Sequence, residues 1–228
     1  EALMDGTYLT ALRTGAASGA ATDVLARKDA RVAAVFGAGA QGRTQLEAVC
    51  VVRPIEEAWI YDVSRERAEV MADEMSERIA ASIEVAETPA EAVRRADVVC
   101  TATTSTSPVF TDADVEPGTH INAIGAYTPQ MQEIPPETIL RAKVVIDHRE
   151  AALAEAGDLL IPIRQGVMTM EHIHAELGEI VTGASSGRES EEEITLVKSV
   201  GVAVQDVAAA EAVLAAAREV GLGTTLAL

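Results

Sequence analysis

The 228-residue chain has few lysines, aromatic residues or cysteines. Lys28, Lys143 and Lys198 are its only lysines, and 36 acidic against 18 basic residues give a net charge of −18. Nucleic-acid-binding proteins need a basic surface, so this balance excludes that class and disfavours anionic membranes. An acidic surface poor in lysine suits a protein kept soluble at high salt, and an ordinary acidic cytoplasmic protein fits the composition equally well.

The chain also lacks the apolar runs that address a protein to a membrane. No basic segment followed by an apolar one opens the sequence, so no secretory signal is expected. The longest alanine-rich stretch, 207–217, contains Glu211 and is too short to span a bilayer. Cys50 and Cys100 lie in separate apolar stretches, which predicts two buried thiols rather than a disulfide. We therefore expect a cytoplasmic protein without a membrane partner.

Hydrophobic residues make up 48% of the chain, enough for a sizeable core. Short apolar runs alternate with helical patterns from residue 31 to 147, which favours an α/β fold with a doubly wound parallel sheet. The expected strands are 31–36, 58–61, 83–85, 97–102, 120–124 and 143–147. Between them, helices are expected at 41–52, from Ser64 to about residue 80, at 88–95 and at 136–141.

Helical patterns flank this region on both sides. One or two helices are expected over 3–25, where Gly15 and Gly19 interrupt the pattern. Past the last expected strand, helices are expected at 148–156, 171–181 and 199–220, with a polar loop at 183–193. This predicts three parts, which are a helical lead-in at 1–28, a dinucleotide-binding domain at 29–150 and a helical segment at 151–228 that packs back on the lead-in.

The turn at 37–42, GAGAQG, carries the glycine spacing of a dinucleotide-binding (Rossmann) domain. It follows one expected strand, opens an expected helix, and is followed by Asp62 at the end of the next strand. Gly37 permits a tight turn, Gly39 lets the backbone approach a pyrophosphate, and Gly42 lets helix and strand pack closely. The free N–H groups of the helix N-terminus attract the phosphates. The turn therefore predicts NAD or NADP, while FAD usually needs a longer chain.

Residues near this turn set the expected choice of cofactor. A carboxylate at Asp62 would accept hydrogen bonds from the adenosine ribose and repel the extra phosphate of NADP, which favours NAD. Arg65 is close in sequence and would soften that preference. The hydroxyl-rich segment 101–108 follows a strand and either contacts the nicotinamide ribose or is a solvated loop. Tyr127 either exchanges a proton or, as we prefer, forms a wall of the pocket.

Other polar residues give weaker indications. His172 and His174 are two apart in an expected helix and would not share a face, so no metal site is predicted. Glu176 and Glu179 are expected on a solvated or dimer-facing surface. Asp158 either lines the cleft or caps a turn.

Six segments in chain order resemble the ornithine cyclodeaminase and mu-crystallin family. They are MDGTYLTALRTGAASGAATD at 4–23, VFGAGAQGRTQLEAV at 35–49, INAIGAYTPQMQEI at 121–134, DHREAALAEAGDLL at 147–160, HAELGEIVTG at 174–183 and EEITLVKSVG at 192–201. The resemblance implies a Rossmann domain flanked by a partial substrate and dimerisation domain, to which the lead-in at 1–28 would belong. It implies hydride transfer between a nicotinamide and the C-alpha of an amino acid or imine, as in alanine dehydrogenase and in pyrroline-2-carboxylate or ketimine reductases.

The resemblance also assigns individual residues. Arg13 matches an arginine that grips the substrate carboxylate, which a guanidinium binds through two parallel hydrogen bonds. Val200, with Ser199 and Gly201, matches a turn that approaches the substrate. Cofactor contacts are implied, besides those of the glycine turn and Asp62, for Thr14, Ala40, Gln41, Thr101, Thr103, Ile124 and Gly125.

Two departures from the family pattern shape the expected activity. Cyclodeaminases carry a catalytic Asp where this chain has Tyr127, which favours a dehydrogenase or imine reductase over an ornithine cyclodeaminase with NAD as internal cofactor. No catalytic residue is assigned for this reason. Family members usually begin with a long segment ahead of Glu1 that supplies substrate contacts and most of a dimer sheet, so a homodimer is expected for the full-length form. A non-catalytic cofactor-binding module or inactive fragment is the third interpretation.

Overall fold

Short apolar strands that pair in parallel form the centre of the molecule. The computed structural model describes residues 2–224, and its strands follow the order β3-β2-β1-β4-β5-β8-β6-β7 in one sheet. Every registered pair in that sheet is parallel. The strands are β1 (Val32–Phe36), β2 (Glu57–Tyr61), β3 (Ser82–Val85), β4 (Val98–Thr101), β5 (His120–Ala123), β6 (Lys143–Ile146), β7 (Ile173–Glu176) and β8 (Thr195–Lys198).

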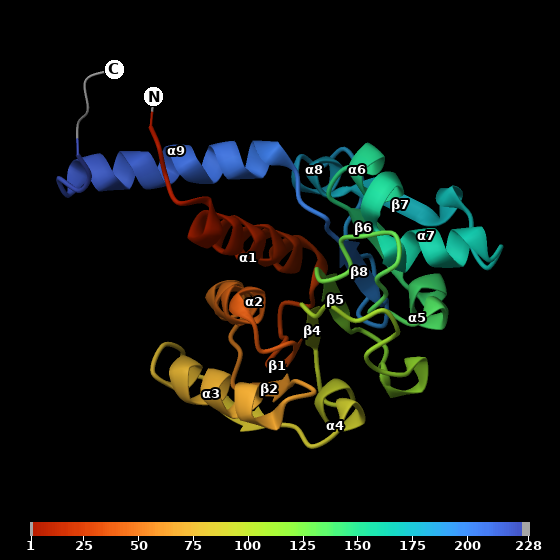
Figure 1. Cartoon of the computed structure of the whole chain (residues 1–228). Coiled ribbons are helices and arrows are strands. Elements are labelled where there is room, and N and C mark those ends of the chain that lie inside the picture. The colour runs from red at the N-terminus through yellow and green to blue at the C-terminus, as the bar shows by residue number, and fades with distance from the viewer. Residues whose placement is uncertain (1, 225–228) are drawn as a thin grey trace.

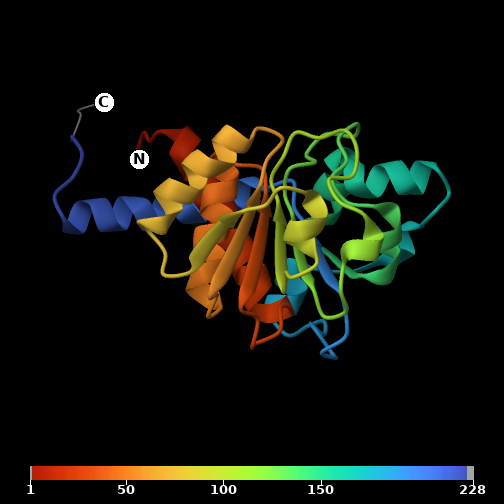
Figure 2. The ribbon, with the colours of Figure 1, turned by 90° about the horizontal axis from the view of Figure 1, so that it is seen from below.

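Helices cover both faces of this sheet (Figures 1 and 2). Their bounds are α1 (Gly6–Leu25), α2 (Ala40–Val52), α3 (Arg65–Ser76), α4 (Pro89–Val93), α5 (Pro136–Arg141), α6 (Arg149–Glu155), α7 (Gly157–Arg164), α8 (Leu177–Val181) and α9 (Ala203–Glu219). Ser64 and Thr88 cap α3 and α4 as predicted, because their hydroxyl oxygens accept the backbone N–H groups of Arg67 and Glu91. The predicted doubly wound parallel sheet is therefore confirmed.

Alternate residues of each strand feed two separate layers of the core. Ala33 and Val35 of β1 pack with α2 and α3, whereas Ala34 and Phe36 pack on the opposite face with α4. A smaller cluster on the first face joins α1 and α8 to β6 and β8. Both faces of the sheet are thus buried beneath helices, and the loops that follow the strands lie at its carboxyl and amino ends.

The opening segment forms one helix, α1, which is one of the two alternatives that its glycine-interrupted pattern left open. Gly15 and Gly19 lie where α2 crosses α1, and a Cβ on Gly15 would stand 2.6 Å from the carbonyl oxygen of Thr44. A Cβ on Gly19 would stand 3.3 Å from that of Ala48. The two glycines therefore permit close packing between helices rather than marking a helix end.

The region beyond residue 150 departs from the sequence prediction. The segment 171–181 was expected to be one helix, but it contains a short 3-10 turn (Met170–His172), then β7, then α8. β8 was not predicted, and it lies between β5 and β6 in the same sheet. A purely helical C-terminal part was therefore a wrong prediction. The helices expected at 148–156 and 199–220 are present as α6 and α9, and the last helix packs on the first as expected, since α9 lies beside α1 (Figure 1).

Both cysteines are free thiols, as predicted, but of the two only Cys100 is fully buried, because Cys50 lies at the edge of the buried face of α2. Burial raises the pKa of Cys100 to about 12, and that of the partly exposed Cys50 to about 11. Such thiols stay protonated near neutral pH and react slowly. Among residues 2–224, no helix is long and apolar enough to cross a membrane.

Candidate cofactor and substrate site

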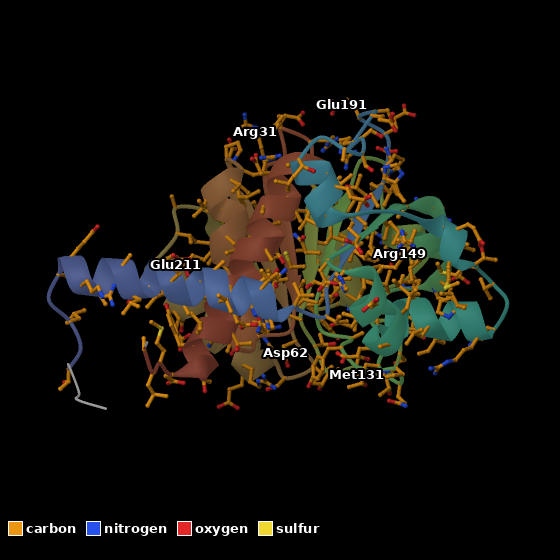
Figure 3. The ribbon with its side chains drawn as sticks, turned by 90° about the horizontal axis from the view of Figure 1, so that it is seen from above. Arg31, Asp62, Met131, Arg149, Glu191 and Glu211 are labelled. Carbon is orange, nitrogen blue, oxygen red and sulfur yellow. The ribbon has the colours of Figure 1, made fainter. Side chains whose placement is uncertain are left out.

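The carboxyl ends of the parallel strands meet at one edge of the sheet, and a pocket of about 660 Å³ opens there. Asp62 and Met131 lie on this side of the molecule, whereas Arg31 and Glu191 lie on the opposite side (Figure 3). The lining comes from the ends of β1, β2 and β4 and from the segments that follow them. Of the residues predicted to bind a cofactor, it brings together Gly37, Gly39, Ala40, Gln41, Asp62 and Thr103.

The glycine turn at 37–42 has the shape that close approach to a ligand requires. Gly37 has a φ of 101°, and a Cβ there would lie 2.5 Å from the carbonyl oxygen of Ala102. A Cβ on Gly42 would overlap the carbonyl oxygen of Gly37, so this glycine lets α2 pack against the turn. At Gly39, the N-cap of α2, an added Cβ would meet only the guanidinium of Arg67, at 3.9 Å. The backbone thus stays open toward the pocket.

Polar groups at the start of α2 fit a dinucleotide. The first turn of a helix has N–H groups that no helical carbonyl accepts, and Gly39 adds no side-chain cap. Free donors of this kind bind phosphate groups. Gln41 lines the pocket, and its buried side-chain oxygen has no hydrogen-bond partner in the described part of the chain. A pyrophosphate with its neighbouring ribose would supply the missing partners.

Asp62 holds the turn at the mouth of the pocket. Its carboxylate accepts the backbone N–H of Ala38 at 2.8 Å and that of Ser64 at 2.9 Å. Arg65, predicted to lie near the cofactor, instead forms ion pairs with Glu69 and Glu87 and does not line the pocket. Two residues later on the same helix, Arg67 does line it. Of the two arginines on α3, the one that lines the pocket is therefore Arg67, which the sequence analysis did not single out.

The loops after β4 and β5 meet on a buried carboxylate that sequence reasoning missed. Glu133 is fully buried, and one of its oxygens accepts the Thr101 hydroxyl at 2.9 Å and the Gly125 N–H at 2.7 Å. The same oxygen accepts the Ala126 N–H at 3.1 Å, and the other accepts the Thr103 N–H at 2.6 Å. Thr101 and Gly125, predicted to contact the cofactor, thus lie behind the pocket wall.

Two further buried charges adjoin Glu133. Asp158 accepts the backbone N–H groups of Glu133 and Ile134 at 2.7 and 3.0 Å. Its other oxygen lies 3.1 Å from the ammonium of Lys198, which donates to the carbonyl oxygen of Ala123 at 3.0 Å. Asp158 therefore neither lines the pocket nor simply caps a turn, because it anchors the segment that carries Glu133.

Arg13, the predicted substrate-binding arginine, lies at the turn that follows β8. Its Nε is 3.0 Å from a carboxylate oxygen of Asp206, and its Nη1 donates to the side chain of Gln205 at 3.2 Å. Gly201 has a φ of 88°, and a Cβ there would lie 2.6 Å from Arg13 Nη1. The structure therefore brings Arg13 next to the predicted turn at 199–201.

Asp147, at the end of β6, fixes that turn. One of its carboxylate oxygens accepts the Ser199 hydroxyl at 2.9 Å and the backbone N–H groups of Val200 and Gly201 at 2.8 and 2.7 Å. Three charge-assisted hydrogen bonds to one carboxylate hold a short segment firmly. The backbone opposite Arg13 is consequently well ordered.

Other predicted residues lie outside the pocket lining. Thr14 donates its hydroxyl to the Thr10 carbonyl within α1. Ile124 is buried, and its N–H binds the Thr101 carbonyl at 2.9 Å. Tyr127, the expected wall, is 51% exposed and does not line the pocket.

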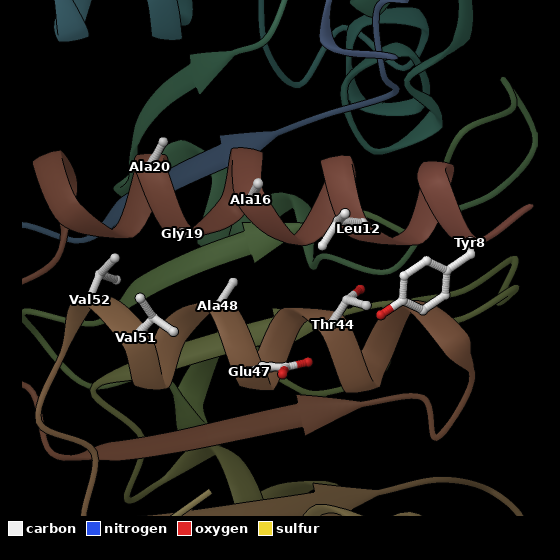
Figure 4. Close-up of a pocket in the computed structure, with 10 residues that line it drawn as sticks. All are labelled: Tyr8, Leu12, Ala16, Gly19, Ala20, Thr44, Glu47, Ala48, Val51 and Val52. Carbon is white, nitrogen blue, oxygen red and sulfur yellow. The ribbon is translucent and has the colours of Figure 1, made fainter. Parts of the chain in front are cut away.

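A second pocket of about 360 Å³ lies between α1 and α2 (Figure 4). Small and apolar side chains form most of it, with Tyr8 at one end and Glu47 as its one charged lining residue. It lacks the converging polar groups of a reaction site.

The comparisons with known proteins agree with the geometry of the pocket. The family model described as "Ornithine cyclodeaminase/mu-crystallin family" matches residues 1–221. A delta(1)-pyrroline-2-carboxylate reductase of Bacillus cereus is 44% identical, over 99% of this chain and 69% of its own length. The solved Thermococcus litoralis delta(1)-pyrroline-2-carboxylate reductase, in complex with NADH and L-proline, is 46% identical with a TM-score of 0.96, covering 99% of this chain and 70% of that one. An archaeal alanine dehydrogenase dimer with bound NAD is 42% identical with a TM-score of 0.92, covering 99% of this chain and 69% of that one. The chain belongs to the ornithine cyclodeaminase/mu-crystallin family.

Proposed function

We propose that the protein is an NAD-dependent oxidoreductase that transfers a hydride between the nicotinamide and the C-alpha of an amino acid or cyclic imine. The observation that carries this proposal is the glycine turn at 37–42, which opens with Asp62 into a 660 Å³ pocket at the carboxyl edge of the sheet. Relatives above 40% identity that are named as reductases and dehydrogenases support the same reaction class. Bound NAD supplies the hydride acceptor, or NADH the donor.

Each part of the site has a proposed role. The N-terminus of α2 and Gly39 would bind the pyrophosphate, and Asp62 the adenosine ribose. Thr103, at the far wall, would contact the nicotinamide half of the cofactor. Arg13 would hold the substrate carboxylate in place of Asp206, beside the turn at 199–201. No residue is assigned as the proton donor.

Delta(1)-pyrroline-2-carboxylate with L-proline, and pyruvate and ammonia with L-alanine, are the first substrate pairs that we propose. They follow from the names of the B. cereus, T. litoralis and archaeal relatives. Tyr127 stands where cyclodeaminases carry their catalytic Asp, so ammonia release from ornithine without net cofactor turnover is the less favoured activity. We also propose a cytoplasmic location and a homodimer for the full-length form, since the alanine dehydrogenase relative is a dimer.

Titration of the purified chain with NADH and NADPH in high salt, followed by nicotinamide fluorescence, tests the proposal. We expect NADH to bind more tightly, and cofactor to be consumed or produced with one of the proposed substrate pairs. Binding without turnover on any amino acid or imine would instead support a cofactor-binding module. A chain that unfolds cooperatively yet binds neither cofactor would contradict the proposal.

A further inference from the structure

We propose that Glu133 is a positioning residue that ties the pocket-lining segment 103–109 to the loop after β5 and thereby sets the shape of the cofactor pocket. The inference rests on the proposed function, because it concerns how the same pocket holds NAD. It adds a residue that does not touch the pocket itself and that no sequence motif points to.

The hydrogen bonds of Glu133 join two loops that belong to different strands. Thr101 and Thr103 end β4 and begin the segment that lines the pocket, whereas Gly125 and Ala126 follow β5. All four residues donate a hydrogen bond to the same carboxylate. Three of the four are backbone N–H groups, which can only donate. The ionised carboxylate, which can only accept, is therefore the form that satisfies them.

The backbone around Glu133 holds the same wall further along. Its carbonyl oxygen accepts the N–H of Val109 at 2.8 Å, and the N–H of Gln132 donates to the Ser105 carbonyl at 3.0 Å. Val109 and Ser105 both line the pocket. The wall is therefore fixed near its start by the Glu133 side chain and along its length by the backbone of 132–133.

Burying a carboxylate is costly, so its presence here requires a reason. An apolar side chain at 133 would leave the N–H groups of Thr103 and Ala126 without an acceptor, whereas that of Gly125 would keep only the Thr101 carbonyl at 3.1 Å. Lys198 and Asp158 form an ion pair beside it and anchor the backbone of 133–134 and of Ala123. The arrangement thus specifies one position for each loop, which an apolar contact would not do.

The geometry gives this role a dependence on pH. Burial raises the pKa of Glu133, the charge of Lys198 lowers it and that of Asp158 raises it, with a net rise. Asp158 from α7 and Lys198 from β8 are the charged groups that face it among the described residues. A proton on either oxygen would meet a donor and displace it. Cofactor affinity is therefore greatest above this pKa and falls as the pH drops through it, beginning above the usual range of a glutamate.

Glu133→Gln tests the proposal with little change of size. An amide can accept the hydrogens on one side only, so its NH₂ group faces at least one N–H and releases part of the wall. We expect the Kd for NADH at neutral pH to rise about tenfold, as one buried hydrogen-bond mismatch predicts. The Kd of the unsubstituted chain should rise as the pH is lowered, and that of Glu133→Gln should not. Arg53→Met serves as the control, because Arg53 lies at the other end of α2 and its loss should lower Tm without changing the Kd.

Each outcome decides the inference. A Kd for Glu133→Gln within about twofold of that of the unsubstituted chain overturns it, as does an equal loss of affinity in Arg53→Met. Failure of the unsubstituted chain to bind NADH overturns the proposed function, which is a distinct result. Should Glu133→Gln not fold, amide hydrogen exchange of the cofactor-free unsubstituted chain replaces it. Slow exchange at Thr103 and Ala126 that quickens together, after correction for intrinsic rates, as the pH falls supports the proposal, and unprotected amides refute it.

Discussion

At the scale of single residues, Asp62 and Arg67 face the same pocket with opposite charges. A carboxylate at this place repels the extra phosphate of NADP, and a guanidinium attracts it. We predict that Asp62→Asn narrows the preference for NADH over NADPH by about tenfold, since a charge beside a bound phosphate contributes at least 1.4 kcal/mol when partly desolvated. Fluorescence titration with both cofactors measures the ratio.

The two arginines of α3 provide matched variants for this test. Arg67→Gln should weaken NADPH binding and leave NADH binding nearly unchanged. Arg65→Gln removes the same charge from a side chain that is paired with Glu69 and Glu87 outside the pocket, so it should alter neither affinity. An effect of Arg65→Gln equal to that of Arg67→Gln would show that the arginines act through net charge rather than through contact.

What the sequence reveals of the site depends on how local each residue's role is. Gly37, Gly42 and Asp62 could be predicted because a tight turn between a strand and a helix constrains residues at fixed spacing. Glu133 and Lys198 could not, since their partners lie in segments brought together only by the sheet. The one available hint was Lys198, a charged residue in the mostly apolar stretch 194–200.

At the scale of elements, one buried arginine, Arg53, joins the end of α2 to the end of α1. Arg53 follows α2, and its guanidinium donates to the carbonyl oxygens of Thr22, Asp23 and Ala26 at the end of α1. It also forms an ion pair with the Asp23 carboxylate at 3.0 Å. These bonds satisfy the last carbonyls of a helix that has no basic residue of its own in its last turn.

We predict that Arg53→Met lowers the free energy of unfolding by about 3 kcal/mol, because the Ala26 carbonyl loses its donor and the Thr22 and Asp23 carbonyls each lose one of two donors. Urea denaturation followed by circular dichroism measures the change. Lys28→Met is the matched control, since Lys28 also bonds Asp23 but is mostly exposed, and its loss should have little effect. Equal losses in the two variants would refute the capping role of Arg53.

Elements with strong local patterns could be predicted, and those defined by their neighbours could not. β1, β2, β4 and β6 are mainly apolar runs between turn residues, so their existence follows from the sequence. β8 is as short as β3 to β6, but it follows a polar loop rather than a helix, and its place in the sheet is set by its pairing with β5 and β6 on either side. In β7 the buried residues Ile173 and Ala175 alternate with the exposed His174, which is the two-residue period of a strand. The apolar residues over 171–181 also fit helical spacing, and a helix was predicted there for that reason.

At the scale of the whole molecule, the net charge of −18 acts on every conformation that the chain adopts. Folding brings like charges together, and this self-repulsion destabilises the compact state. Raising NaCl from about 0.1 to 1 M shortens the screening length from about 10 to 3 Å. We therefore predict that Tm rises with NaCl over this range, as differential scanning calorimetry would show. KCl should act alike, and a Tm that stays constant or falls would contradict a surface adapted to salt.

The position of β8 governs the order in which the sheet can be completed during synthesis. β5 and β6 do not pair with each other, because β8 lies between them, and β8 ends only at residue 198. A ribosome has therefore released most of the chain before the middle of the sheet can close. Until then β5 and β6 each present an unpaired edge, the kind of surface that joins to other chains. A nascent chain stalled ahead of residue 195 would be a substrate for chaperones, even though the glycine turn at 37–42 has by then long been synthesised.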